Sequence, residues 1–145
     1  LKLADQLINV YSYLDADLLY AGVILHDIGK VKEFTGPIVP AYSIEGSLVG
    51  HISIGHAMVK DMAEELHIEG EEVFLLEHMI LSHHGKQEYG SPVLPQIPEA
   101  EALTLIDNVD ARMNMFEKAL KDTEPGSYSA RIFGLENRNV YKSHH

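Results

Sequence analysis

The stretch LLYAGVILHDIGK, residues 18–30, decides the fold of this chain. Residues 18–25 are apolar on every side of a helix except at Tyr20, which is the pattern of a helix buried at the centre of a helical domain. This apolar run leads directly into the polar pair His26 and Asp27. We therefore expect a central helix that carries a histidine and an aspartate at its carboxyl end.

The position of Asp27 requires a physical explanation. Burying an ionised carboxylate without a partner costs several kcal/mol, so a buried Asp27 must be ion-paired, hydrogen-bonded or bound to a metal ion. The alternative is a helix end that simply turns two polar residues toward water. His26 and Asp27 taken alone do not decide between these interpretations.

Apolar residues spaced by three and four positions predict amphipathic helices on both sides of the central one. These helices cover residues 3–14, about 47–66, 71–84 and 102–120, and either Asp15 or Asp17 is placed to cap the start of the central helix. Residues 34–46 predict a loop, either plain or with a short β-hairpin, because glycines and prolines interrupt β-forming residues there: Gly36, Pro37, Pro40 and Gly46. The expected fold class is all-α, a helical bundle.

The composition fits one soluble domain and argues against several classes of protein. A chain of 145 residues, 46% of them hydrophobic, is long enough for one compact core. No run approaches the roughly 18 apolar residues of a membrane span, and the start does not resemble a signal peptide, so we expect a cytoplasmic protein that does not enter a membrane. The absence of cysteine excludes disulfides and thiolate metal sites.

The formal net charge of −11 has the wrong sign for a surface that binds nucleic acid with clustered basic residues. A polyanionic substrate would therefore need bound divalent cations, or a separate basic module, to supply positive charge.

Several histidines and an aspartate lie on the inward side or edge of the predicted helices: His51, the doublet His83 and His84, and Asp107. Imidazole and carboxylate groups suit Mn, Fe, Co, Ni or Zn ions, and a helical bundle can direct them to one interior point. Each histidine alone could equally be a hydrogen-bonded core residue, but together they predict a metal site. His56 lies about 140° round its helix from His51, so we favour His51 as the ligand.

Five stretches carry a specific resemblance: GVILHDIGK at 22–30, GHISIGH at 50–56, SHHGKQEYGSP at 82–92, EA at 99–100 and DNVDAR at 107–112. In this order they resemble the HD superfamily of metal-dependent phosphohydrolases, which implies an HD-domain, PDEase-like helical bundle. More narrowly, they resemble the HD domain of the YhaM-type 3′ to 5′ exoribonucleases of Gram-positive bacteria. The resemblance covers most of residues 1–120.

The resemblance implies a set of metal ligands. His26 and Asp27 match the pair that names the superfamily, and Asp27 would bridge two divalent ions, with Mn²⁺ favoured and Fe, Co, Ni or Zn as alternatives. Asp107 would bind the first ion, whereas His51 and His83 would bind the second.

The resemblance also implies roles in catalysis and substrate binding. Two cations would activate a water molecule and stabilise charge on the phosphate, and Asp27 and Lys30 are the expected catalytic residues. Lys30 would face the substrate phosphate, His84 would be either a further ligand or a phosphate contact, and Arg112 is a further substrate-binding candidate. An exonuclease of this type would release nucleoside 5′-monophosphates from single-stranded RNA.

One feature departs from the superfamily pattern. The pattern opens with a histidine well before the HD pair, but residues 1–25 contain none. We therefore expect residues 1–145 to be a single HD domain that lacks its N-terminal helix and an upstream OB-like domain, with His144 and His145 as the start of a purification tag. Two other functions stay open: an HD-type hydrolase of mononucleotides or signalling nucleotides, and a catalytically inactive nucleotide-binding module. Homo-oligomerisation stays open too.

Overall fold

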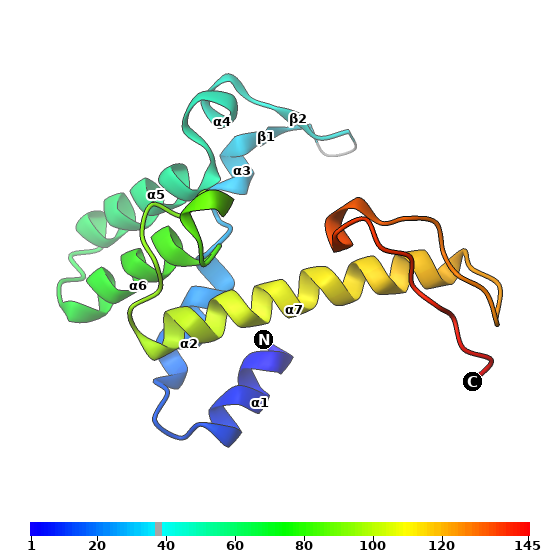
Figure 1. The fold of residues 1–145 in the computed structure, drawn as a ribbon. Coiled ribbons are helices and arrows are strands. Elements are labelled where there is room, and N and C mark those ends of the chain that lie inside the picture. Colours follow the sequence, from blue (N-terminus) through cyan, green and yellow to red (C-terminus); the bar gives the residue numbers. More distant parts are fainter. Residues whose placement is uncertain (37–38) are drawn as a thin grey trace. The chain divides into compact units, whose positions relative to one another are not determined.

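The computed structural model describes residues 1–36 and 39–145, and this part of the chain is mainly helical (Figure 1). It divides into two compact units, Leu1–Leu105 and Ile106–His145. Pro37, one of the prolines of the predicted loop, lies outside the described residues. Among the described helices, none is both long and apolar enough to cross a membrane.

The first unit contains all but the last helical segments of the chain. Its elements are α1 (Lys2–Val10), α2 (Ala16–Leu25), α3 (Lys30–Glu33), β1 (Phe34–Thr35), β2 (Ala41–Tyr42), α4 (Ile44–Val49), α5 (His51–Glu65), α6 (Glu71–Ser82), the short helix η1 (Gln87–Tyr89) and the beginning of α7 (Pro98–Lys121). Helices α5 and α6 lie side by side, and α6 also packs against α2 (Figure 1). The predicted all-α class is confirmed.

The core of the first unit forms where α2, α6 and the start of α7 meet. Leu19, Met79, Ile80 and Leu103 are fully buried there. Gly22 permits this contact, because a Cβ atom at this position would overlap the side chain of Met79. One face of α2 is therefore as tightly packed as the apolar run predicted.

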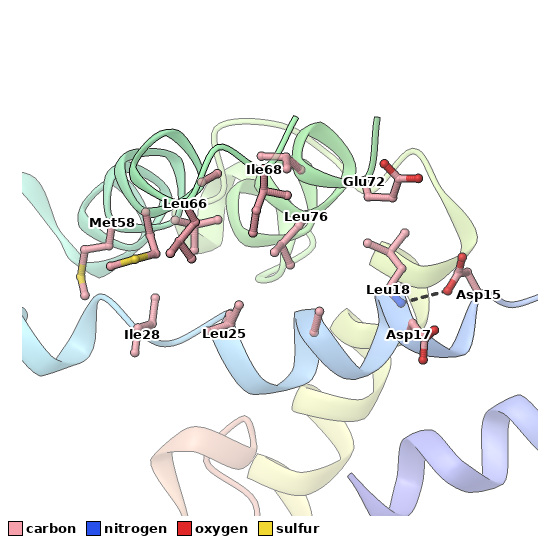
Figure 2. A pocket seen from close by; sticks show the side chains of 15 residues that line it. Asp15, Asp17, Leu18, Leu25, Ile28, Met58, Leu66, Ile68, Glu72 and Leu76 are labelled. Atoms are coloured by element: carbon pink, nitrogen blue, oxygen red, sulfur yellow. Dashed lines mark hydrogen bonds between the residues drawn. The ribbon is translucent and has the colours of Figure 1, made fainter. Parts of the chain in front are cut away.

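The rest of α2 is less buried than the sequence predicted. Ile24 is 63% exposed, and Leu18 and Leu25 line a cavity of about 740 Å³ between α2, α5 and α6 (Figure 2). The expectation that α2 is buried on all sides is thus wrong, because its helical neighbours cover only part of its circumference. The start of the helix is as expected: the Asp15 carboxylate accepts a hydrogen bond from the Leu18 backbone N–H at 3.0 Å.

The predicted helix over about 47–66 is two helices in the structure. Helix α4 ends at Val49, Gly50 has a φ of 77°, and His51 is the first residue of α5. The apolar stripe hid this break, because it continues through Gly50 in the sequence although Leu48 is 81% exposed in the structure. Glycine adopts a positive φ without steric cost, so Gly50 allows the chain to turn between the helices.

Two helices end earlier than the sequence predicted, and the hairpin is present. The helix predicted over 3–14 ends at Val10, and Leu14 is buried beyond a turn. The helix predicted over 71–84 ends at Ser82 with His83 as its cap. The option of a short β-hairpin is confirmed, because β1 and β2 are antiparallel with Phe34 opposite Tyr42 and Thr35 opposite Ala41.

The second unit consists of the later turns of α7 and an irregular segment with the short helix η2 (Phe133–Leu135). Isolated bridges join Tyr128 to Tyr141 and Ile132 to Arg138. Leu135 is fully buried. No periodicity in the sequence predicted this arrangement, because it depends on single contacts and not on a repeating pattern.

Replacing Gly50 by alanine should lower the free energy of unfolding by about 1–2 kcal/mol, because alanine is strained at a positive φ. A Cβ atom would meet nothing within 4 Å, so steric overlap does not contribute. Urea unfolding of the two proteins measures the change. Ser47→Ala, an exposed change on α4, is the control and should stay within about 0.5 kcal/mol of the parent. Equal stability of Gly50→Ala and the parent would contradict the backbone argument.

Candidate metal centre

Three helix ends of the first unit bring a group of histidines and one aspartate together. His26 caps the carboxyl end of α2 and Asp27 follows it, His51 begins α5, and His83 caps the carboxyl end of α6 with His84 next in the chain. These elements are far apart in sequence, and their packing places the polar side chains at one point. We call this group the histidine cluster: His26, Asp27, His51, His83 and His84.

Asp27 is the centre of the cluster. Its Oδ1 atom lies 3.6 Å from His51 Nε2 and 3.8 Å from His83 Nε2, and its Oδ2 atom lies 3.5 Å from His26 Nε2. The rings of His83 and His84 are 4.3 Å apart between centroids. One ligand nitrogen from each of His51, His83 and His84 lies within 4.8 Å of the other two. The candidate ligands within the first unit are therefore close neighbours.

Each imidazole of the cluster is anchored through its Nδ1 atom. His26 Nδ1 forms a hydrogen bond with the carbonyl of Val23 at 3.0 Å, and His83 Nδ1 forms one with the carbonyl of Ile80 at 2.7 Å. Both carbonyls belong to the last turn of the helix that the histidine caps, where intrahelical donors run out. A histidine at a helix carboxyl end thus turns its Nε2 atom outward from the helix.

The other two rings are anchored by contacts with other segments or a loop. His84 Nδ1 bonds to the carbonyl of Tyr89 at 2.7 Å, and His51 Nδ1 bonds to Oε1 of Glu33 at 3.1 Å. Because every one of these partners is an oxygen acceptor, Nδ1 carries the proton in each ring. The Nε2 atoms are then left with a lone pair, which is the form of imidazole that binds metal ions.

Three atoms at the centre of the cluster are buried and have no hydrogen-bond partner among the described residues: Asp27 Oδ1, His51 Nε2 and His83 Nε2. Leaving a buried acceptor unsatisfied costs about 1–3 kcal/mol. All three are acceptors, so they cannot satisfy one another, whereas a cation would satisfy them together. The donor set of imidazole nitrogen and carboxylate oxygen therefore fits a divalent transition-metal ion.

Burial also keeps His83 in its neutral form. Its side chain is fully buried, and this desolvation lowers the pKa of His83 to about 4, although the carbonyl of Ile80 acts in the opposite direction. At neutral pH the ring carries no charge. It can therefore donate its Nε2 lone pair without first losing a proton.

Gly29 determines how closely Asp27 approaches α5. A Cβ atom at Gly29 would overlap the carbonyl oxygen of His51 and would lie 2.7 Å from the backbone nitrogen of Gly55. Only glycine lets the chain after Asp27 lie directly against the first turn of α5. The glycine of the HDIGK stretch thus has a definite structural role.

Lys30 contacts the cluster directly. Its ammonium group lies 2.7 Å from Asp27 Oδ2, and its side chain remains 43% exposed. The ammonium group of Lys30 is thus held at the rim of the cluster, where a substrate could reach it. This placement agrees with the predicted phosphate contact, which stays a prediction.

The remaining site candidates are His56, Asp107 and Arg112. The ring of His56 bonds to Glu77 of α6 at 3.0 Å. Asp107 and Arg112 belong to the second unit, in which Arg112 forms two hydrogen bonds to the carboxylate of Glu136, at 2.8 and 3.2 Å. The proposed roles of Asp107 and Arg112 therefore stay predictions.

Glu33 is a residue of the site that sequence reasoning missed. It is 6% exposed and bonds to both the backbone N–H and the ring of His51. A glutamate between lysine-rich and β-forming residues resembles a solvated surface side chain. No local pattern reveals that it faces a histidine eighteen positions away.

Comparison with known proteins places this geometry in a family. The HD domain model matches residues 1–112. The chain belongs to the HD domain family. The resemblance inferred from the five motif stretches is thereby confirmed, and the helix ends that meet at Asp27 are those of an HD domain.

The curated relatives of this HD domain are longer proteins. The 3′-5′ exoribonuclease YhaM of Bacillus subtilis (strain 168) is 56% identical over 142 residues, which cover 98% of this chain and 45% of that protein. The proteins of the same name from Bacillus pumilus (strain SAFR-032) and Geobacillus sp. (strain WCH70) are each 54% identical over 98% of this chain. The chain spans less than half the length of these relatives. No solved structure matches it significantly.

The metal-free HD domain should lose stability as the pH falls from about 6.5 to about 4. Over that range the unfolded chain protonates His83, whereas the folded protein, with a pKa of about 4, does not. The loss of unfolding free energy due to His83 amounts to roughly 3 kcal/mol at most. Above pH 6.5 there is no such loss, because His83 is neutral in both the folded and the unfolded chain. Urea unfolding across this pH range measures it. His83→Gln should show a shallower decline, and an identical pH dependence would show that His83 does not titrate as stated.

Proposed function

We propose that this chain is the catalytic domain of a divalent-metal-dependent 3′ to 5′ exoribonuclease. The observation that supports the proposal most directly is the convergence of buried acceptor atoms on Asp27, in a domain of the HD family. The names of relatives that are 54–56% identical to the chain support the choice of reaction.

Within this proposal, the histidine cluster holds the metal. Asp27, His51 and His83 contribute the three buried ligand atoms, and His26 and His84 lie beside them. Asp107 of α7 is proposed as a further ligand of the first ion. Two ions are expected, with Mn²⁺ preferred and Fe, Co, Ni or Zn as alternatives, because nitrogen and oxygen ligands without thiolate suit all of these metals.

Bound cations would supply Lewis acidity at the phosphate oxygens and a water nucleophile that is deprotonated near neutral pH. The residues of the chain position these groups. Asp27 contributes negative charge at the centre, and His83, which burial keeps neutral, adds a ligand nitrogen without further charge. Lys30, held 2.7 Å from Asp27, is placed to stabilise charge that develops on a non-bridging phosphate oxygen.

The reaction is hydrolysis of the last phosphodiester bond at a free 3′ end. Water adds to phosphorus, the bond from phosphorus to the 3′ oxygen of the preceding nucleotide breaks, and that oxygen takes up a proton. The terminal nucleotide leaves as a 5′-monophosphate. The net charge of −11 makes RNA binding dependent on the cations, because the domain would otherwise repel a polyanion.

End-labelled single-stranded RNA tests the proposed reaction. With Mn²⁺ and a 5′ label, the protein should produce a ladder that shortens from the 3′ end, together with 5′-monophosphates. RNA blocked by a 3′ phosphate is the control. Intact RNA combined with hydrolysis of mononucleotides would reject the exonuclease and favour a nucleotide hydrolase.

Replacing Asp27 by asparagine should reduce Mn²⁺ affinity and turnover by at least about 100-fold, because the central anionic ligand is lost. Calorimetric titration with Mn²⁺ measures binding separately from activity. Asp61→Asn removes an exposed carboxylate of α5 and is the matched control, which should retain both properties. If Asp27→Asn bound Mn²⁺ like the parent, Asp27 would not belong to the site.

A further inference from the structure

Glu33 is a buried carboxylate at the edge of the histidine cluster. It ends α3, and its Oε1 atom accepts hydrogen bonds from the backbone N–H and the ring Nδ1 of His51, both at 3.1 Å. His51 Nε2 lies on the other side of the ring, 3.6 Å from Asp27 Oδ1. The imidazole of His51 thus stands between two carboxylates.

We propose that Glu33 is a positioning residue that sets the tautomer, the orientation and the ligand strength of His51. This inference rests on the proposed metal-dependent function. A carboxylate that accepts the Nδ1 proton fixes the lone pair on Nε2 and makes the imidazole a stronger donor to a cation. Glu33 would act on the metal through His51, without contacting the metal itself.

His51 differs in this respect from the other rings of the cluster. The Nδ1 atoms of His26, His83 and His84 bond to backbone carbonyls, whereas that of His51 bonds to an ionisable side chain. A charged acceptor polarises an N–H group more strongly than a neutral carbonyl does. His51 is therefore the ring whose donor strength depends on a replaceable residue.

The backbone of Glu33 is held in place independently of its side chain. Its carbonyl accepts a hydrogen bond from the Ser43 N–H at 2.9 Å, and the Ser43 hydroxyl donates to the carbonyl of Lys32 at 2.7 Å. Gly46 of α4 lies so close that a Cβ atom there would overlap the carbonyl oxygen of Glu33. The carboxylate is thus fixed before any ligand arrives, so orienting His51 requires little reorganisation.

Glu33 also acts as a cap of α5. The residue before this helix is Gly50, which offers no side chain to accept from the first N–H groups, and Glu33 accepts from the His51 N–H instead. A negative charge at a helix amino end is favourable. An experiment must therefore separate loss of this cap from loss of control over the ring.

Two substitutions of Glu33 and one control make that separation. Glu33→Gln keeps an oxygen acceptor but loses the charge, and Glu33→Ala loses both. Ser43→Ala removes the hydroxyl that caps α4 and bonds to Lys32, next to Glu33, without touching His51. Ser43→Ala should lower the free energy of unfolding about as much as the Glu33 substitutions do, and it should leave the affinity for Mn²⁺ unchanged.

Calorimetric titration with Mn²⁺, on variants shown to be folded by circular dichroism, is the first measurement. Affinity should fall about 10-fold in Glu33→Gln and up to about 100-fold in Glu33→Ala, and should be unchanged in Ser43→Ala. Parental affinity in both Glu33 variants, with lowered unfolding free energy, would overturn the proposal and leave Glu33 as a helix cap only.

The tautomer of His51 in the metal-free chain is the second measurement. Long-range nitrogen–proton NMR correlations of the imidazole should report a protonated Nδ1 in the parent and a mixture of tautomers in Glu33→Ala. An unchanged spectrum would overturn the inference. If the parent failed to bind Mn²⁺, the proposed function would fail on that result, and the tautomer would still decide the role of Glu33.

Discussion

The arrangement of the first unit depends on the burial of one carboxylate oxygen beside imidazole nitrogens that are also acceptors. Asp27 Oδ1, His51 Nε2 and His83 Nε2 have no hydrogen-bond partner among the described residues, and water is largely excluded from them. Such a group is unfavourable unless a cation satisfies it. The fold therefore holds three unsatisfied acceptor atoms together, and the surrounding helices place them at a single point.

The ends of the helices position the imidazole rings of the cluster through hydrogen bonds to Nδ1. Histidines at the carboxyl ends of α2 and α6 use carbonyls of the last turn to anchor Nδ1, so that each Nε2 extends beyond its helix. At α5 the helix begins at the cluster, where carbonyl acceptors are absent and N–H donors are in excess. A carboxylate from another element, Glu33, meets both needs there, since it accepts from the backbone and from the ring of His51.

Glycines allow these ends to approach closely. Gly29 places the chain after Asp27 against the carbonyl of His51, Gly46 places α4 against the backbone of Glu33, and Gly50 lets the chain turn into α5. The cavity beside α2 lies between α2, α5 and α6, but among the described residues its lining contains none of the histidine cluster (Figure 2). Tight packing in the first unit is thus concentrated around the cluster and the core, whereas α2 keeps an exposed Ile24 and a cavity beside it.

The sequence by itself determined the helical class, the hairpin option, a helix cap at either Asp15 or Asp17, and the ligand candidates His26, Asp27, His51, His83 and His84, because periodicity, caps and motifs are local properties of the chain. Only the tertiary structure decided that a helix breaks at Gly50, that Ile24 is exposed and that Glu33 serves His51. These features depend on which distant residue lies opposite, and a backbone N–H or a carboxylate has the same sequence signature whether its partner is water or a side chain eighteen positions away. The physical difference lies in burial, which tertiary packing alone creates.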